Sequence, residues 1–245
     1  MTDLPGFGAR LARFMERRNL DVGTLDKVSA LELQAVIEGL EPSASLLLRL
    51  APALGLHVQD LFVLAGAAVP EELAPPDPDA GSSVTSVALE AMSLTAERIR
   101  ELQRLVQDLP QEARTKPAKP PRQADPGPGG FLLGMLDNRN LARYSTAKTA
   151  YLGTRGQIYL SEATIQHALV HSRQLTPEMF AGFAVVLGIP VADLAALTGF
   201  DLPNEALPEQ PPAPVLAELM WSLRRLSSRQ ARHVATVARA MGQEG

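Results

Sequence analysis

Two histidines in the second half of the chain have the spacing of a metal-binding pair. His167 and His171 are four residues apart in the segment SEATIQHALVH, so on a helix they lie on one face. A zinc site needs at least a third protein ligand, and none follows at a motif spacing. The position after His167, where a metalloprotease helix carries glutamate, is Ala168. The sequence therefore predicts no metal site here.

The other patterns that support catalysis are also missing. The GPGG segment at 127–130 is not followed by the Lys-Ser/Thr pair of a phosphate loop, so it is expected to be a linker. No nucleophile elbow, paired-carboxylate spacing or dinucleotide fingerprint is found. The 245 residues include no cysteine, which excludes disulfides, thiolate metal sites and cysteine nucleophiles. We expect neither enzymatic activity nor a cofactor.

The composition favours a helical protein. Hydrophobic residues make up 46% of the chain and aromatic residues only 4%. The formal net charge of −4 is unusual for a protein that binds nucleic acid over its whole surface, but the charge is uneven. Residues 71–110 contain eight acids and three bases, and residues 111–245 contain eleven acids and fourteen bases. With no visible signal peptide and no apolar run of membrane length, we expect a cytoplasmic protein without a membrane partner.

One segment of the chain occurs twice. LAPALGLHVQDLFVLAG, at 50–66, aligns without gaps with FAVVLGIPVADLAALTG, at 183–199, and eight of seventeen positions are identical. The identities include the pairs Leu54/Leu187, Asp60/Asp193 and Gly66/Gly199. Such self-similarity predicts two copies of one helical unit, with Leu54, Leu61, Leu187 and Leu194 in the cores.

Helical periodicity divides each copy into five short helices. The first begins with the apolar stripe of Leu11, Phe14 and Met15 and stops near Asn19. The other helices expected in the first half span 22–28, 30–38, 45–54, 58–64, 84–93 and 96–108. In the second half they span 131–140, 145–152, 161–171, 176–187 and 191–197, with a final pair between 214 and 243. Thr95, Ser161 and Ser227 are expected N-caps.

Pro-rich segments separate these units. Residues 68–82 predict a flexible joint, and residues 110–130 predict an extended, mobile tether. The two tail helix pairs repeat the same apolar spacing. The apolar cluster of Met220, Trp221 and Leu223 is expected to pack within the chain or to join two chains as a homodimer.

The duplicated unit resembles the Cro/repressor-type (lambda-repressor-like) helix-turn-helix family. The resemblance covers about residues 1–66 and 131–200, and in the second copy it is carried by YLSEATIQHALVHSRQLTPEMFAGFAVVLGIPVADLAALTG. It implies an all-α fold of two lambda-repressor-like five-helix domains, each followed by a two-helix tail. The implied segments are a first domain at 1–67, a tail at 83–109, a linker at 110–130, a second domain at 131–200 and a tail at 214–243.

In that family the third helix enters the major groove, which implies a DNA-binding role for 161–171. Ile165 and Leu169 would form its inner face, and Gln166 and His167 would point outward, where glutamine can pair with adenine. The other residues implied to contact DNA from the second copy are Ser161, Glu162 and Ala163 at the helix start, and Lys148, Arg155 and Arg173 on phosphates.

The first copy departs from the family pattern. Its third helix, LELQAVIEG, offers Gln34 as a polar group but contains no base, and Glu32, Glu38 and Glu41 would repel phosphates. Arg10 is its candidate phosphate contact. RGQIYL, at 155–160, lengthens a turn of the second copy, either as an added DNA-contacting loop or as a site adapted elsewhere.

The resemblance implies a sequence-specific transcriptional regulator that binds double-stranded DNA, with the second copy dominant in reading bases. The alternative is a protein–protein interaction module with a degenerate helix-turn-helix fold that regulates a partner protein. The acidic third helix of the first copy and the net negative charge favour this alternative.

Overall fold

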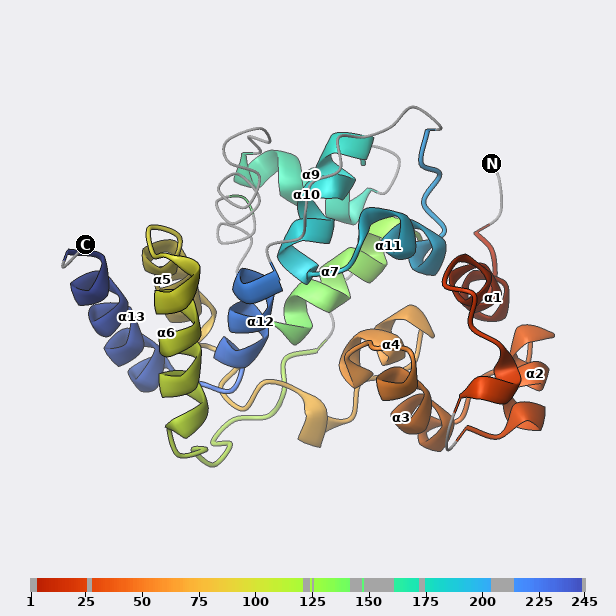
Figure 1. Cartoon of the computed structure of the whole chain (residues 1–245), viewed down its shortest axis with the longest axis horizontal. Helices are drawn as coiled ribbons and strands as arrows, with labels where there is room; N and C mark the ends of the chain where they lie inside the picture. Colours follow the sequence, from red (N-terminus) through yellow and green to blue (C-terminus); the bar gives the residue numbers. More distant parts are fainter. Residues whose placement is uncertain are drawn as a thin grey trace.

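The computed structural model describes residues 4–25, 28–120, 124, 126–141, 147, 161–171, 175–203 and 214–243 (Figure 1). Within these ranges every regular element is helical, which confirms the all-α prediction. None of the described helices is by itself long and apolar enough to cross a membrane; α10 and α11 reach that length only as a pair bent by 104°.

The first copy is built from short capped helices. Its elements are α1 (Phe7–Arg17), the 3-10 turn η1 (Val22–Thr24), α2 (Ala30–Ile37), α3 (Ala44–Ala53) and α4 (Val58–Leu64). Ser29 and Ser43 cap α2 and α3 by accepting a backbone N–H three residues on. The predicted helix at 22–28 is reduced to the single turn η1, and residues 26 and 27 lie outside the described part.

The described elements of the second copy follow the same order. They are α7 (Pro128–Asn138), α9 (Glu162–Val170), α10 (Pro177–Leu187) and α11 (Val191–Thr198). Ser161 and Thr176 are N-caps, and Gly188 and Gly199 end their helices with a left-handed backbone. The helix predicted at 145–152 lies outside the described residues, where only residue 147 is placed.

The first helices of the two copies end in the same way. Asn19 after α1 and Asn140 after α7 both have a positive φ, 51° and 54°, and no other described non-glycine residue does. Each asparagine lies in the same tripeptide, Arg-Asn-Leu. Asparagine tolerates this conformation better than most residues, so both copies leave the first helix through the same turn.

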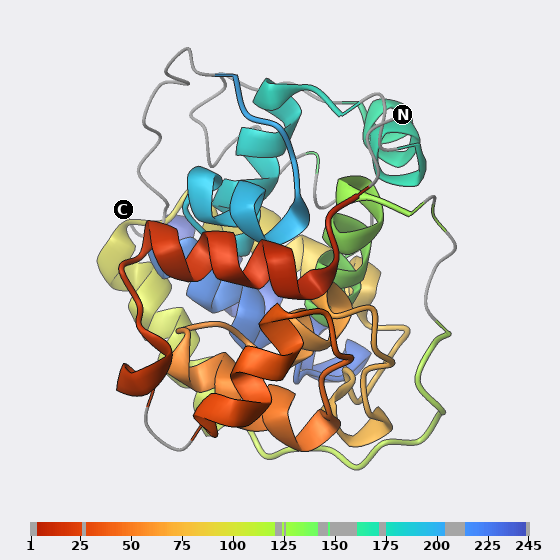
Figure 2. The same cartoon turned by 90° about the vertical axis from the view of Figure 1, so that its right-hand side faces the viewer.

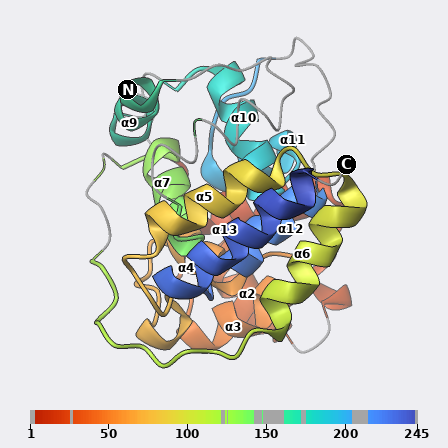
Figure 3. The ribbon, with the colours of Figure 1, turned by 90° about the vertical axis from the view of Figure 1, so that its left-hand side faces the viewer.

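The two tails form one structural unit. They are α5 (Gly81–Ala91) and α6 (Ala96–Asp108) from the first half, and α12 (Pro214–Leu223) and α13 (Ser228–Gln243) from the second. α5 packs against α13 and α6 packs against α12, so the four helices form a bundle at one end of the molecule (Figures 1 and 3). The sequence did not predict this pairing, because the repeat places each tail with its own domain.

The bundle buries the surface that was expected to join two chains. Met220 and Leu223 are inaccessible to solvent, and Trp221 is only partly exposed. Packing within the chain, the first of the two expectations for this cluster, is what the structure shows, and no contact between two chains is needed to cover Met220 and Leu223. The predicted caps are confirmed: Thr95 caps α6, and Ser227 and Gln230 exchange hydrogen bonds at the start of α13.

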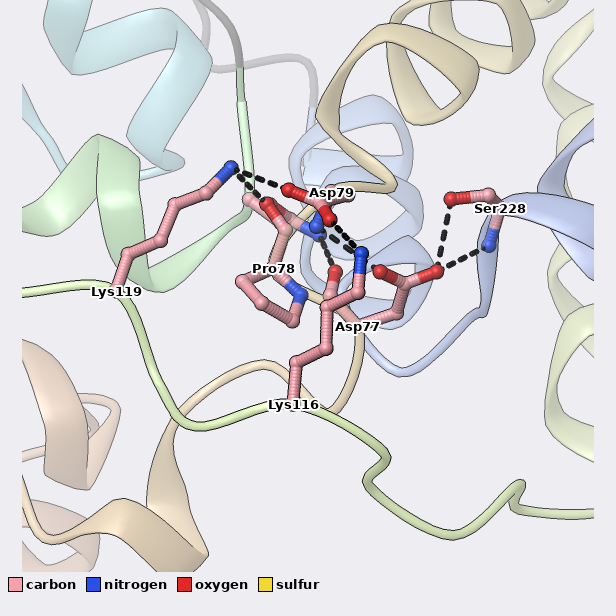
Figure 4. Close-up of polar contacts among 7 residues, drawn as sticks. Asp77, Pro78, Asp79, Lys116, Lys119 and Ser228 are labelled. Atoms are coloured by element: carbon pink, nitrogen blue, oxygen red, sulfur yellow. Dashed lines mark hydrogen bonds and ion pairs between the residues drawn. The ribbon is translucent and has the colours of Figure 1, made fainter.

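The described start of the linker is bound rather than free. Arg114 donates hydrogen bonds to the carbonyl oxygens of Glu71 and Ala74, both at 2.8 Å. Lys116 and Lys119 both contact the Asp79 carboxylate (Figure 4). Residues 110–120 thus run extended along the acidic 71–79 segment, which corrects the prediction of a mobile tether there. Opposite charges in the two Pro-rich segments explain their pairing, although exposed ion pairs contribute little stability.

Gly8 is the closest approach of α1 to α2. A Cβ atom placed there would lie 2.0 Å from the carbonyl oxygen of Val36. We expect Gly8→Ala to lower the free energy of unfolding by about 3 kcal/mol, because backbone rather than a flexible side chain must move. Gly23→Ala is the control, since nothing lies within 4 Å of that site. Urea denaturation of both variants tests this, and equal losses would contradict it.

Candidate nucleic-acid interface

Two helix–helix contacts join the two copies. α1 of the first copy packs on α11 of the second, and α7 of the second packs on α4 of the first (Figures 1 and 2). In each contact the first helix of one copy therefore meets the last helix of the other. This arrangement is the one expected of an approximate two-fold relation between the copies.

The same polar contact is made twice across this interface. Arg18 forms an ion pair with Asp193 at 2.7 Å, and Arg17 donates to the other carboxylate oxygen at 3.1 Å. In the related position, Arg139 pairs with Asp60 at 2.9 Å, and Asn138 donates to Asp60 at 2.9 Å. Asp60 and Asp193 are thus identical in the repeat for a structural reason. Each carboxylate binds side chains at the end of the first helix of the opposite copy.

Each arginine also binds a carbonyl in its own copy. Arg18 Nη1 donates to the Leu54 oxygen at 3.4 Å, and Arg139 Nη2 donates to the Leu187 oxygen at 3.2 Å. Leu54 and Leu187 are an identical pair of the repeat, at the ends of α3 and α10. Arg18 and Arg139 therefore each link the end of a helix in their own copy to an aspartate of the other copy.

The two pairs differ in burial. The side chains of Arg139 and Asp60 are 0% and 1% exposed, whereas those of Arg18 and Asp193 are 34% and 8% exposed. The difference arises because Trp221 of α12 covers the buried pair, with the Arg139 guanidinium 5.1 Å from its ring. The tail bundle thus seals one of two equivalent contacts and leaves the other at the surface.

His57 stacks on Trp221, the residue that covers the buried pair. Its ring lies 3.5 Å from the Trp221 ring and nearly parallel to it. Burial, followed by the positive charges of Arg139 and Arg224, lowers the pKa of His57 from 6.5 to about 4, against the opposing effect of Asp60. His57 is therefore neutral at pH 7.

We expect His57 to make stability depend on pH. Below pH 6.5 the unfolded chain takes up a proton that the folded chain refuses until about pH 4, so stability is lost across this interval. Solvent screening of the partly buried ring reduces the loss to about 2 kcal/mol. Urea denaturation at pH 7 and pH 4 measures this effect, with His57→Phe, which keeps a stacked ring, as the reference. Between the two pH values, the free energy of unfolding should fall by about 2 kcal/mol more in the wild type than in His57→Phe. Equal falls would contradict the assignment.

The outward face of α9 carries the residues expected to contact bases. Ser161, Glu162, Ala163, Gln166 and His167 are exposed. The inner face of the helix is buried, with Ile165, Ala168 and Leu169 packed in the core against α7. Gln166 and His167 are therefore presented to solvent on a fixed helix rather than used in packing.

On the corresponding face of the first copy, the polar side chains are bound to one another or to a neighbouring helix. Gln34 is exposed on α2, at the position equivalent to Gln166 when the helices are aligned on the caps Ser29 and Ser161. Its amide donates to Glu38, and the neighbouring Glu32 pairs with Arg49 at 2.7 Å. Arg49, the cation seen to contact this helix in the described part of the chain, is thus already bound to a carboxylate.

Arg10 does not lie at the surface. It is buried, and its guanidinium donates to the carbonyl oxygens of Leu64 at 2.7 Å and Leu197 at 2.6 Å. Leu64 and Leu197 are another identical pair of the repeat, so Arg10 bridges related positions in the two copies. Burial lowers the pKa of Arg10 to about 10. The prediction that Arg10 contacts DNA phosphates is wrong, because its guanidinium is buried and hydrogen-bonded to carbonyl oxygens inside the molecule.

The remaining predicted phosphate contacts, Lys148, Arg155 and Arg173, lie outside the described residues. Among the residues that the structure does describe, no group of three histidine, cysteine or acidic side chains could hold a metal ion. His167 and His171 approach each other, with ring centroids 4.9 Å apart.

Sequence reasoning missed the residues that join the copies. No role in joining the copies was predicted for Arg18, Arg139, Asp60 or Asp193, although a signal was present. The aspartates are identical in the repeat, and the arginines both precede the Asn-Leu pair that ends the first helix. Polar identities in a repeat whose other identities are apolar or glycine point to a shared contact.

Comparison with known proteins found no matching family model, no matching curated protein and no matching solved structure.

Proposed function

We propose that this chain is a sequence-specific DNA-binding regulator that acts as a single-chain pseudo-dimer of two helix-turn-helix-like units. The observation that carries the proposal is the outward face of α9. Gln166 and His167 are exposed while the opposite face of the same short helix is buried. Base reading in a major groove requires this division between a packed face and a free polar face.

The contacts between the copies support the proposal. A regulator that reads two half-sites needs two related units held at a fixed relative position. The pairs Arg18–Asp193 and Arg139–Asp60 hold the copies together. The half-sites are expected one helical turn apart, about 34 Å, or a multiple of it.

The second copy dominates base reading in this proposal. Its outward helix presents glutamine and histidine, whereas α2 presents Gln34 already bound to Glu38. Glu32, Glu38 and Glu41 would oppose phosphates near the first copy. The first copy therefore orients the molecule or assists, and the second copy sets the preferred sequence.

Salt dependence of binding tests the proposal. If four to six phosphates are neutralised, the logarithm of the affinity for duplex DNA should fall with the logarithm of salt concentration at a slope of about −4 to −5. Fluorescence anisotropy of the full chain with a labelled duplex measures this slope. No binding at low salt, or a slope near zero, would refute DNA binding.

A further inference from the structure

Exposed leucines gather in one part of the molecule. Among the described residues, the exposed large hydrophobic side chains are Leu4 (37%), Leu31 (85%), Leu40 (66%) and Leu48 (47%). Three of these four lie between residues 31 and 48, on α2, on the turn after it and on α3. We call Leu31, Leu40 and Leu48 the leucine face. Single exposed leucines are common, but three within eighteen residues make this segment the candidate interaction surface.

The leucine face is particular to the first copy. When the copies are aligned on the repeat, Leu40 corresponds to Arg173 and Leu48 to Ala181. When the third helices are aligned on their caps, Leu31 corresponds to Ala163. At each position the first copy has a leucine where the second copy has a small or basic residue. The surface that would approach DNA in the first copy therefore differs in chemistry from that of the second copy.

Acidic residues surround the leucine face. Glu32, Glu38 and Glu41 are exposed on α2 and the following turn, and between residues 30 and 56 the only base is Arg49, which is paired with Glu32. A groove of about 380 Å³ between α1 and Ile37 of α2 has a similar lining, although none of the three leucines contributes to it. Its lining includes Met15, Leu20, Val22 and Ile37, with Glu16 at the same site. Among the described residues of α2, the turn after it and the groove, apolar side chains and acids predominate.

We propose that the leucine face docks an amphipathic helix of a partner protein, with leucine-like side chains on one side and lysines or arginines along its edges. The leucines supply the apolar contact, and Glu38 and Glu41 meet the cationic edges. The acids would repel DNA phosphates and so favour a cationic protein helix as the occupant. The chain's own arginine-bearing helix, α13, cannot serve, because its apolar side is packed on α5. This inference does not depend on DNA reading by α9.

A pair of synthetic peptides tests the docking surface. The probe is a labelled amphipathic helix of leucine and lysine, about 18 residues or five turns long, and its match carries glutamate in place of every lysine. We expect the full-length protein to bind the lysine peptide at least tenfold more tightly than the glutamate peptide in fluorescence anisotropy. Equal binding of the two would overturn the charge argument.

Surface variants locate the site. Leu31→Ser/Leu48→Ser should weaken the lysine peptide at least tenfold, and Glu38→Gln/Glu41→Gln should weaken it severalfold. Leu4→Ser, at the fourth exposed leucine, should leave binding unchanged. All these side chains are exposed, so circular dichroism should show intact folding. If the Leu4 variant lost as much binding as the leucine-face variant, the proposed site would be wrong. The proposal would also fail if the leucine-face variant changed only self-association in sedimentation.

Discussion

Replacing Arg139 by methionine should lower the free energy of unfolding by about 3–5 kcal/mol. The substitution leaves Asp60 buried with its charge uncompensated, since the pair is almost fully removed from solvent. It also removes hydrogen bonds to the carbonyl oxygens of Met135 and Leu187. Chemical denaturation followed by tryptophan fluorescence measures the loss, and Trp221, the single tryptophan, lies beside the mutated site.

The equivalent substitution in the other copy is the matched control. Arg18→Met breaks the same contact, but solvent reaches the Arg18 side chain and can screen Asp193. We expect a loss of about 1 kcal/mol. A double variant, Arg139→Met/Asp60→Leu, should recover most of the stability lost in Arg139→Met, because no buried charge then remains. Equal losses for Arg18→Met and Arg139→Met would contradict the role assigned to Trp221 and the tail bundle.

Removing the outward polar groups of α9 should abolish sequence preference. In Gln166→Ala/His167→Ala, discrimination between a preferred duplex and its scrambled version is expected to fall by about 30-fold or more, since each lost base contact costs about 1–3 kcal/mol. Affinity for the scrambled duplex should hardly change, because phosphate contacts supply it. Gel-shift titrations with both duplexes measure the two effects separately.

The control for this variant changes the same residue types elsewhere. Gln107 and His233 are exposed on α6 and α13 of the tail bundle, so Gln107→Ala/His233→Ala should keep full discrimination. Unchanged sequence preference in Gln166→Ala/His167→Ala would show that α9 does not read bases.

Helix starts and ends could be predicted from the sequence because they depend on residues only a few positions away. The caps Thr95, Ser161 and Ser227 act on backbone groups three residues away, and left-handed glycines such as Gly188 end helices wherever they occur. The inner face of α9 followed from the spacing of Ile165 and Leu169. The all-α class and most helix bounds could therefore be predicted within a few residues.

The missed features depend on contacts between distant segments. Arg10 looks like one of several arginines on an amphipathic first helix, and only the meeting of Leu64 and Leu197 beside it explains its burial. The pairing of the two tails has the same origin. The apolar side of each tail could pack on its own domain or on the other tail. The periodicity of the sequence does not distinguish these two packings.

The central claim is that a joined pair of related units reads DNA mainly through α9. The most direct test is selection of duplexes from a random pool by the full-length protein at low salt, followed by sequencing. The account predicts enrichment of one asymmetric motif, with a strongly specified half-site and a weakly specified one about one helical turn away. A pool that stays random through successive rounds, with the protein folded throughout, would contradict it.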